Sequence, residues 1–190
     1  MLPVPDARAV AAHYKQLPEG ERGKGFWTRL WPSATALCQF MAVHPQYIAG
    51  KTVWELGAGL GLPALFSTTF AEKVLGTDYA VDAVSNMKYA AKINGLQNFD
   101  ALVWDWTGSM PAPDAEVVLI SDANYDEATH PALQALLIQQ LEAGRTVLLS
   151  TPVRLSGQGF LEPLLPYCVD RQQVGVELPL HVFAFKRSWA

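Results

Sequence analysis

Short apolar runs alternate with longer stretches of helical periodicity along most of the chain. The predicted strands are Thr52–Leu56, Lys73–Asp78, Phe99–Trp104, Ala115–Ile120 and Thr146–Ser150. Ala115–Ile120 is apolar without a break, which is typical of a strand that helices cover on both faces. Strands that alternate with helices in this way predict an α/β fold with a largely parallel sheet.

The stretches between these strands carry apolar residues at three- and four-residue spacing, as an amphipathic helix requires. Leu133 and Leu137, for example, fall on one side of the predicted helix Pro131–Glu142. The other predicted helices are Asp6–Gln16, Ser33–Val43, Leu62–Phe70, Val81–Asn94 and Gly159–Leu165. Ser33, which follows a proline, is predicted to cap the N-terminus of its helix.

The pattern changes after the fifth predicted strand. The runs Tyr167–Gln173 and His181–Lys186 are separated by a loop too short to hold a helix, so they must pair as an antiparallel hairpin. The sequence therefore predicts a doubly wound, mostly parallel seven-stranded sheet that ends in this hairpin, with ligands at the carboxyl ends of its strands. We expect one domain over residues 1–190, in which 1–50 form a helical extension and 51–190 form the α/β core.

Composition and charge narrow the possible functions. Half of the residues are hydrophobic, the formal net charge is −4, and there is no run of Lys or Arg, so nucleic acid is not an expected partner. Met1–Val10 lacks the features of a signal peptide, and no stretch of about 18 apolar residues could span a bilayer. We therefore expect a cytoplasmic protein with no membrane partner. The His and Cys residues are scattered, which disfavours a metal site.

The strongest motif lies at the end of the first predicted strand, where Glu55 and Leu56 precede glycines at positions 57, 59 and 61. Glycines there let a ligand approach the backbone and let the chain turn directly into a helix. The dinucleotide fingerprint Gly-x-Gly-x-x-Gly is not met, because Leu62 follows the third glycine, so we do not expect a nicotinamide cofactor. Taken alone, the glycines are also compatible with a purely structural turn.

Asp78 stands at the end of the next predicted strand, 23 residues after Glu55. An acid at that position can accept hydrogen bonds from both ribose hydroxyls of a nucleoside. The alternative is a turn aspartate that caps the helix beginning at Val81. The glycine motif upstream favours the nucleoside interpretation.

Two motifs, Glu55–Gly61 and Gly76–Tyr79, taken in this order, resemble those of class I S-adenosylmethionine-dependent methyltransferases. Three further segments are similar to the lysine methyltransferase-like branch, often called methyltransferase family 16: Leu30–Ala34, Asp105–Trp106 and Ser121–Tyr125. The resemblance runs from about residue 27 to residue 154. It implies a Rossmann-like methyltransferase fold and S-adenosyl-L-methionine as the cofactor.

The resemblance also implies which residues hold the cofactor. Gly57 and Gly59 would lie against its methionine and ribose portions, and Asp78 would bind the ribose. Trp106 would lie near the adenine, while Trp31 would close the cavity from the N-terminal side. The full set of implied cofactor contacts is Trp31, Glu55, Gly57, Ala58, Gly59, Asp78, Asp105, Trp106 and Ser121.

Asp122 and Tyr125 correspond to the Asp-x-x-Tyr element that lines the methyl-acceptor pocket in that family. Their predicted role is to orient an acceptor amine, with Asp122 accepting a hydrogen bond, and the Tyr125 ring can hold a cationic or planar acceptor. The residues between them, Ala123 and Asn124, depart from the aliphatic pair that is usual in relatives. Arg154 resembles a basic residue that follows the fifth strand, with no role implied.

The resemblance implies N-methylation of a protein lysine. Two alternatives remain at this stage: a methyltransferase that acts on a small amine or heterocycle, and an inactive protein that keeps only the cofactor fold. The expected partners are the methyl acceptor and the cofactor, and we expect a monomer.

Overall fold

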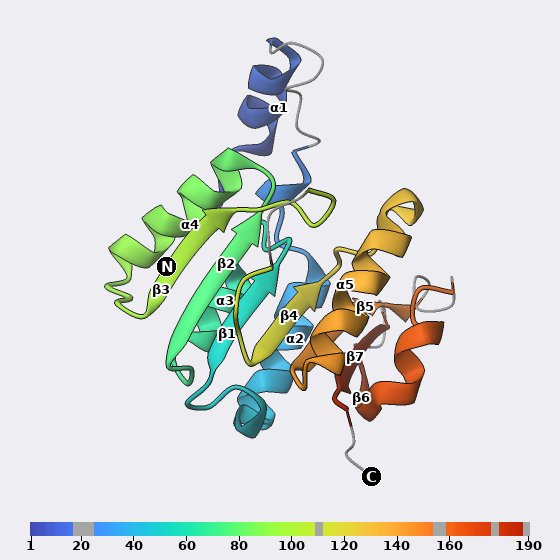
Figure 1. The fold of residues 1–190 in the computed structure, drawn as a ribbon. Coiled ribbons are helices and arrows are strands. Elements are labelled where there is room, and N and C mark those ends of the chain that lie inside the picture. Colours follow the sequence, from blue (N-terminus) through green and yellow to red (C-terminus); the bar gives the residue numbers. More distant parts are fainter. Residues whose placement is uncertain (17–24, 109–111, 154–158, 176–178, 188–190) are drawn as a thin grey trace.

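The computed structural model describes residues 1–16, 25–108, 112–153, 159–175 and 179–187 (Figure 1). Its centre is a seven-stranded sheet in the order β3-β2-β1-β4-β5-β7-β6. The strands are β1 Thr52–Leu56, β2 Lys73–Asp78, β3 Phe99–Val103, β4 Val117–Ser121, β5 Thr146–Pro152, β6 Cys168–Val174 and β7 Leu180–Phe185. The predicted fold class, a doubly wound α/β sheet of seven strands, is confirmed.

The pairing of the strands determines which strand ends lie side by side. Strands β1 to β5 pair in parallel, and β7 is antiparallel to both of its neighbours, β5 and β6. The predicted C-terminal hairpin is therefore present. Leu56 at the end of β1 lies beside Thr77 of β2 and Ile120 of β4. The carboxyl ends of these three strands consequently reach the same edge of the sheet.

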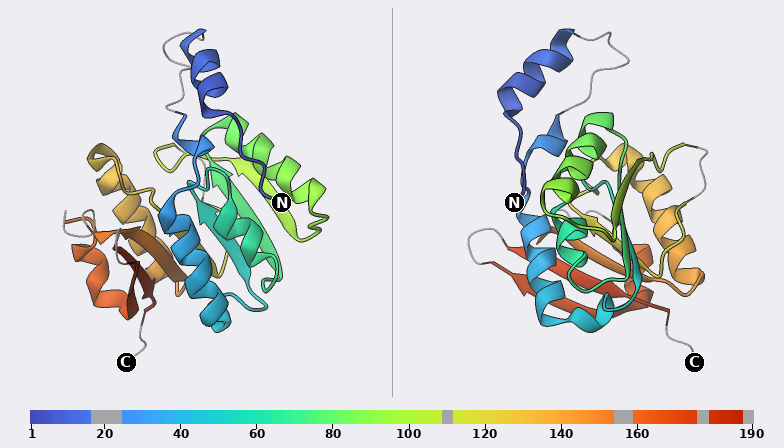
Figure 2. Two further views of the ribbon diagram at one scale, coloured as in Figure 1. Left: turned by 180° about the vertical axis from the view of Figure 1, so that it is seen from behind. Right: turned by 90° about the vertical axis from the view of Figure 1, so that its left-hand side faces the viewer.

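Helices cover both faces of the sheet (Figure 2). They are α1 Ala7–Gln16, η2 Phe26–Thr28, α2 Pro32–Val43, η3 Pro45–Tyr47, α3 Leu62–Ser67, α4 Val81–Ile93, η4 Glu127–Thr129, α5 His130–Glu142 and η5 Glu162–Tyr167. The helices α2, α3 and α4 lie on one face, and α5 and η5 lie on the other. Within these described segments, no helix is both long and apolar enough to cross a bilayer.

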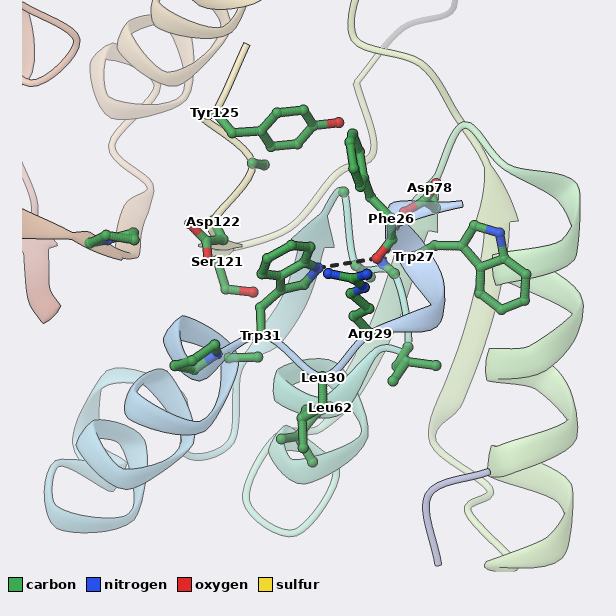
Figure 3. A pocket seen from close by; sticks show the side chains of 18 of the residues that line it. Phe26, Trp27, Arg29, Leu30, Trp31, Leu62, Asp78, Ser121, Asp122 and Tyr125 are labelled. Atoms are coloured by element: carbon green, nitrogen blue, oxygen red, sulfur yellow. Dashed lines mark hydrogen bonds between the residues drawn. The ribbon is translucent and has the colours of Figure 1, made fainter. Parts of the chain in front are cut away.

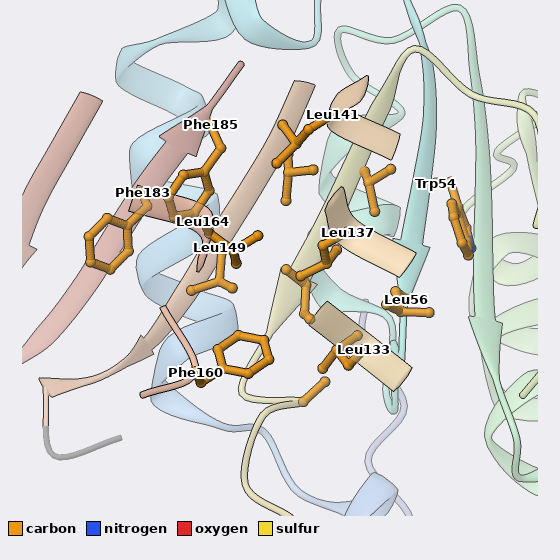
Figure 4. Close-up of a cluster of buried hydrophobic side chains, with 14 of the residues drawn as sticks. Trp54, Leu56, Leu133, Leu137, Leu141, Leu149, Phe160, Leu164, Phe183 and Phe185 are labelled. Carbon is orange, nitrogen blue, oxygen red and sulfur yellow. The ribbon is translucent and has the colours of Figure 1, made fainter. Parts of the chain in front are cut away.

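Successive side chains of β4 divide between two buried clusters. Leu119 packs in the cluster that contains Leu37 and Phe40 of α2. Ile120 packs on the opposite face, in the cluster that contains Leu137 of α5 (Figure 4). Because side chains alternate across a strand, burial of both faces requires the unbroken apolar run that the sequence shows.

Helix α2 belongs to this core although it precedes the first strand. Its residues Leu37, Phe40 and Met41 are buried against the face of the sheet that contains Val53 and Leu148. Helix α1 buries only Tyr14 and stands at one end of the molecule, beyond α4 (Figure 1). The sheet face and α2 therefore share one apolar layer.

The predicted cap of α2 at Ser33 is wrong. The helix begins one residue earlier, with Pro32 in its first turn and Trp31 at the N-cap. Proline suits the first helical position because its φ is already helical and it has no N–H to leave unpaired. The Ser33 hydroxyl is instead buried, without a hydrogen-bond partner in the described part of the chain.

The segment predicted as the helix Gly159–Leu165 forms the 3-10 helix η5 at Glu162–Tyr167. Proline is tolerated in its first turn, but Pro166 inside it lacks the N–H that an α-helix would use, so an α-helix cannot continue there. Helix α3 also ends earlier than predicted, at Ser67, whose hydroxyl donates to the carbonyl oxygen of Pro63 at 2.7 Å.

Strand order reverses between β1 and β4. From β1 the chain continues through α3 to β2 and then to β3 on one side, and it returns to β4 on the other side of β1. The loops after β1 and β4 therefore diverge and leave a crevice at the carboxyl edge, where open α/β sheets bind their ligands. Gly57 follows β1, and Asp122 follows β4.

Candidate active site

A cavity of about 490 Å³ opens at this crevice (Figure 3). That volume is within the range of small-molecule sites. The predicted site residues that line it are Trp31, Gly57, Ala58, Gly59, Asp78, Trp106, Ser121, Asp122 and Tyr125. Glu55 and Asp105 do not line it. Arg154 lies outside the described residues.

Gly57 is the first residue after β1, and its backbone is left-handed with φ 62°. A Cβ built there would stand 3.3 Å from the Trp106 ring and 3.3 Å from the side chain of Ala123. Only glycine combines this φ with such close neighbours. The loop after β1 therefore presents backbone, and not a side chain, to the cavity.

Asp78 ends β2 and is 5% exposed. Its two carboxylate oxygens accept backbone hydrogen bonds, one from the N–H of Gly59 and one from the N–H of Ala80, both at 2.9 Å. Burial raises the pKa of Asp78, and these backbone donors oppose the shift by stabilising the carboxylate. Asp78 thus has the turn role that the sequence left open, and it also faces the cavity.

Glu55 lies beneath the cavity and is fully buried. Its carboxyl accepts a hydrogen bond from the N–H of Ala64 at 2.8 Å and one from the Ser121 hydroxyl at 3.5 Å. Burial, with a further contribution from Asp78, raises the pKa of Glu55 to about 8. The residue joins β1, α3 and β4 below the glycine loop, so its predicted contact with a cofactor is not supported by its position.

The Asp105–Trp106 pair divides between two roles. Asp105 is exposed, and its carboxylate accepts from the N–H of Thr107 at 2.8 Å, which closes a turn. Trp106 faces the cavity, and its buried indole N–H has no hydrogen-bond partner among the residues that the structure describes. A hydrogen-bond acceptor on a bound ligand would pair with this donor and remove the free-energy cost of leaving it buried and unpaired.

Asp122 lies immediately after β4 and begins the cavity wall that faces Asp78 and the glycine loop. It is the non-glycine residue with positive φ in the described chain, at φ 57°. Its N–H donates to the carbonyl oxygen of Ser150 at 3.0 Å, which ties the loop to β5. A left-handed aspartate at the mouth of a cavity is an energetically costly conformation of the kind that is concentrated at functional sites.

Tyr125 continues this wall and packs edge-on against Phe26, with ring centroids 5.4 Å apart. Partial burial, together with Tyr79 and Asp78 nearby, raises the pKa of Tyr125 to about 12. The phenol therefore stays protonated at neutral pH. Below it, the buried side chain of Asn124 accepts a hydrogen bond from the Thr151 hydroxyl at 3.0 Å, so this departure from the usual aliphatic residue has a structural role.

The segment Phe26–Trp31 crosses the cavity mouth between these walls, and we call it the strap (Figure 3). The backbone of Trp27 stands 3.5 Å from the position of a Cβ on Gly59, so the strap lies directly over the glycine loop. The Trp27 indole N–H donates to the Tyr14 hydroxyl at 2.9 Å, and that hydroxyl donates to the carboxylate of Asp82 at 3.0 Å. The strap is thus joined to both α1 and α4.

Of the strap residues that line the cavity, the family resemblance predicted only Trp31 as a cofactor contact. Phe26, Trp27 and Arg29 also line the cavity, as does Tyr79 after β2. The concentration of aromatic residues just before α2 was the available signal, and Tyr79 stands next to Asp78 in a motif that was recognised. Their placement depends on tertiary packing, because the strap has no helical or strand periodicity.

Comparison with known proteins places the chain in a family. Residues 16–162 match the family described as lysine methyltransferase. The electron transfer flavoprotein beta subunit lysine methyltransferase of Mus musculus is 28% identical over 133 residues, or 68% of this chain and 51% of that protein. The histone-arginine methyltransferase METTL23 of Xenopus laevis is 28% identical over 103 residues, or 51% of this chain and 44% of that protein. The chain therefore spans about half the length of these relatives.

Among solved structures, an SAM-dependent O-methyltransferase from Thermotoga maritima superimposes with a TM-score of 0.61. The match covers 98% of this chain and 73% of that chain at 14% sequence identity, so it bears on the fold alone. The family match, by contrast, includes the strap, the glycine loop and the loop after β4. On that match, the chain belongs to the lysine methyltransferase family.

Proposed function

We propose that the protein transfers a methyl group from S-adenosylmethionine to the side-chain amine of a lysine in another protein. Membership of the lysine methyltransferase family supports this function. The observation that carries it is the shared cavity, because Asp78 and the glycine loop form one wall and Asp122 and Tyr125 form the other. A methyl donor bound to one wall and a methyl acceptor bound to the other would therefore meet in the same cavity.

The residues present fit the proposed cofactor. Gly57 presents bare backbone to the cavity beside the benzene edge of Trp106, and the indole N–H of Trp106 is unpaired among the described residues. The carboxylate of Asp78, held by two backbone donors, keeps lone pairs for the ribose hydroxyls. When bound, the cofactor supplies an electrophilic methyl group on a sulfonium.

The proposed chemistry asks the protein to align an amine and to keep water away. An amine attacks only when neutral, and an apolar enclosure by Phe26, Trp31 and Tyr125 favours the neutral form. Asp122 accepts a hydrogen bond from the amine and directs its lone pair. Tyr125, protonated at neutral pH, holds the aliphatic stem of the acceptor lysine with its ring.

One experiment separates this function from its alternatives. The protein is incubated with methyl-labelled S-adenosylmethionine and an extract from cells that lack it, so that natural acceptors are unmethylated. We expect label in protein, released as methyl-lysine on acid hydrolysis. Label in methyl-arginine would instead support the activity named for the Xenopus relative, and label only in small molecules would support the small-amine alternative.

Two variants control the assay. Asp122→Asn should abolish the labelling, whereas Glu127→Gln, an exposed acid in η4, should leave it unchanged. Absence of label with both the parent protein and Glu127→Gln, despite bound cofactor, would support the inactive-protein alternative. A cytoplasmic location and a monomeric state stay predictions, which fractionation and sedimentation can check.

A further inference from the structure

Arg29 lines the cavity with an exposed side chain, and the proposed function leaves it without a role. It belongs to the strap. Among the described residues that line the cavity, Arg29 alone is basic. Its guanidinium has no hydrogen bond or ion pair within the part of the chain that the structure describes. An unpaired guanidinium at a ligand cavity is a ready partner for an anionic group.

The backbone on either side of Arg29 is fixed. The carbonyl oxygen of Phe26 accepts from the N–H of Arg29 at 3.3 Å and from the indole N–H of Trp31 at 3.1 Å. Thr28 closes the preceding turn, because its hydroxyl donates to the carbonyl oxygen of Gly25 at 2.8 Å. The Arg29 side chain therefore starts from a preorganised position at the cavity (Figure 3).

The position of the strap indicates which part of the cavity Arg29 serves. The Trp27 backbone lies over Gly59, so the strap faces the glycine loop. In the proposed function that loop lies against the methionine and ribose portions of the cofactor, and Asp78, which accepts the N–H of Gly59, lies at the ribose. Arg29 follows Trp27 along the strap toward Trp31, on the side away from Asp78 (Figure 3), which is the methionine end.

The charge of the cavity also favours a cation there. Its other charged lining residues, Asp78 and Asp122, are acids. They attract the sulfonium and the acceptor amine, but they repel a carboxylate. The cofactor carries one carboxylate, on its methionine portion, and Arg29 is the lining residue that can compensate for it.

We propose that Arg29 binds the α-carboxylate of the methionine portion of S-adenosylmethionine and so positions the sulfonium methyl between the two walls. This inference rests on the proposed function. The guanidinium donates two N–H groups in a plane, which matches the two oxygens of a carboxylate. Arg29 is therefore a positioning residue of the cofactor site.

Two ligands that differ in this carboxylate test the proposal. S-adenosylhomocysteine has the amino-acid portion, whereas 5′-methylthioadenosine lacks it. By calorimetry, Arg29→Met should weaken S-adenosylhomocysteine binding by about 10- to 100-fold, as expected for loss of a charge-assisted hydrogen bond. The affinity of the Arg29→Met variant for 5′-methylthioadenosine should stay within about twofold of that of the parent protein. Arg29→Lys, which keeps the charge but not the fork, should be intermediate.

The matched control is Arg8→Met, because Arg8 is exposed on α1 and does not line the cavity. It should bind both ligands as the parent does. Unchanged S-adenosylhomocysteine affinity in Arg29→Met would overturn the proposal, and so would an equal loss for both ligands, which would show a role in strap structure. Normal cofactor binding with a raised KM for the protein acceptor would overturn it too. If the parent bound neither ligand, the proposed function itself would fail.

Discussion

The carboxylate of Asp78 accepts the backbone N–H of Gly59 at 2.9 Å, and this hydrogen bond joins the end of β2 to the glycine loop after β1. The other carboxylate oxygen accepts the N–H of Ala80. Asp78 therefore shapes the cavity wall in addition to facing the proposed ribose site. Its substitution should affect both folding and binding.

Asp78→Ala should weaken the binding of S-adenosylhomocysteine by about 2 kcal/mol or more, because a carboxylate that holds ribose hydroxyls makes charge-assisted hydrogen bonds. The two backbone donors lose their acceptors, so the free energy of unfolding should also fall by about 1–3 kcal/mol. Calorimetry and urea unfolding measure the two effects. Asp114→Ala, at an exposed surface ion pair with Arg145, should change neither by more than about 1 kcal/mol. If Asp78→Ala bound the cofactor as tightly as the parent, Asp78 would have only its role in the turn.

Gly57→Ala, compared with a control glycine, separates the cost of a strained backbone from the effect of a displaced cavity wall. The new Cβ would meet Trp106 and Ala123 at 3.3 Å, so cofactor affinity should fall about tenfold or more as that wall shifts. Gly95→Ala is the matched control, because Gly95 has a similar φ of 66° and no atom within 4 Å of the built Cβ. Both variants should lose about 1 kcal/mol of stability from backbone strain, Gly57→Ala somewhat more because of its two close contacts, and only Gly57→Ala should lose affinity. Equal affinities would place the cofactor away from the glycine loop.

Glu55 should make the protein less stable as the pH rises. Its pKa is raised to about 8 by burial, with a contribution from Asp78, whereas in the unfolded chain it titrates near pH ~4.3. Between these values the folded state binds the proton that the unfolded state has lost, so the free energy of unfolding falls by up to about 1.4 kcal/mol per pH unit.

Glu55→Gln keeps an oxygen acceptor for the N–H of Ala64 but does not titrate. Its free energy of unfolding, from urea denaturation at about pH 5 and about pH 8, should therefore decline less than that of the parent. Glu127→Gln, an exposed acid, should keep the parental decline. The same decline in all three proteins would show that Glu55 does not hold a proton in the folded state.

The sequence predicted those features whose signal is local. The unbroken apolar run of β4 required burial on both faces, and glycines after β1 with an acid after β2 indicated where a nucleoside could bind. The strap could not be predicted in the same way, since its position over Gly59 comes from contacts with Tyr14 and α4 that are distant in sequence. Likewise, a sequence cannot show that Glu55 points beneath the cavity and not into it.

Asp122 and Tyr125 should be needed for methyl transfer and dispensable for cofactor binding. Both stand on the wall that faces the glycine loop, after the end of β4. Asp122→Ala and Tyr125→Ala should each abolish turnover, a loss of about a hundredfold or more from misalignment of the acceptor, with S-adenosylhomocysteine affinity within a few-fold of the parent. Single-turnover rates and calorimetry on the same preparations give both quantities.

Conservative variants show whether the lost group or a disturbed loop is responsible. Asp122 is left-handed, a conformation that asparagine tolerates better than alanine, so Asp122→Asn removes the charge with little backbone strain. Tyr125→Phe keeps the edge-on contact with Phe26 and removes only the hydroxyl. We expect Asp122→Asn to be as inactive as Asp122→Ala, and Tyr125→Phe to keep more activity than Tyr125→Ala because the ring still holds the acceptor stem. Should the two alanine variants turn over as the parent does, the acceptor binds elsewhere in the cavity, and the role assigned to this wall is wrong.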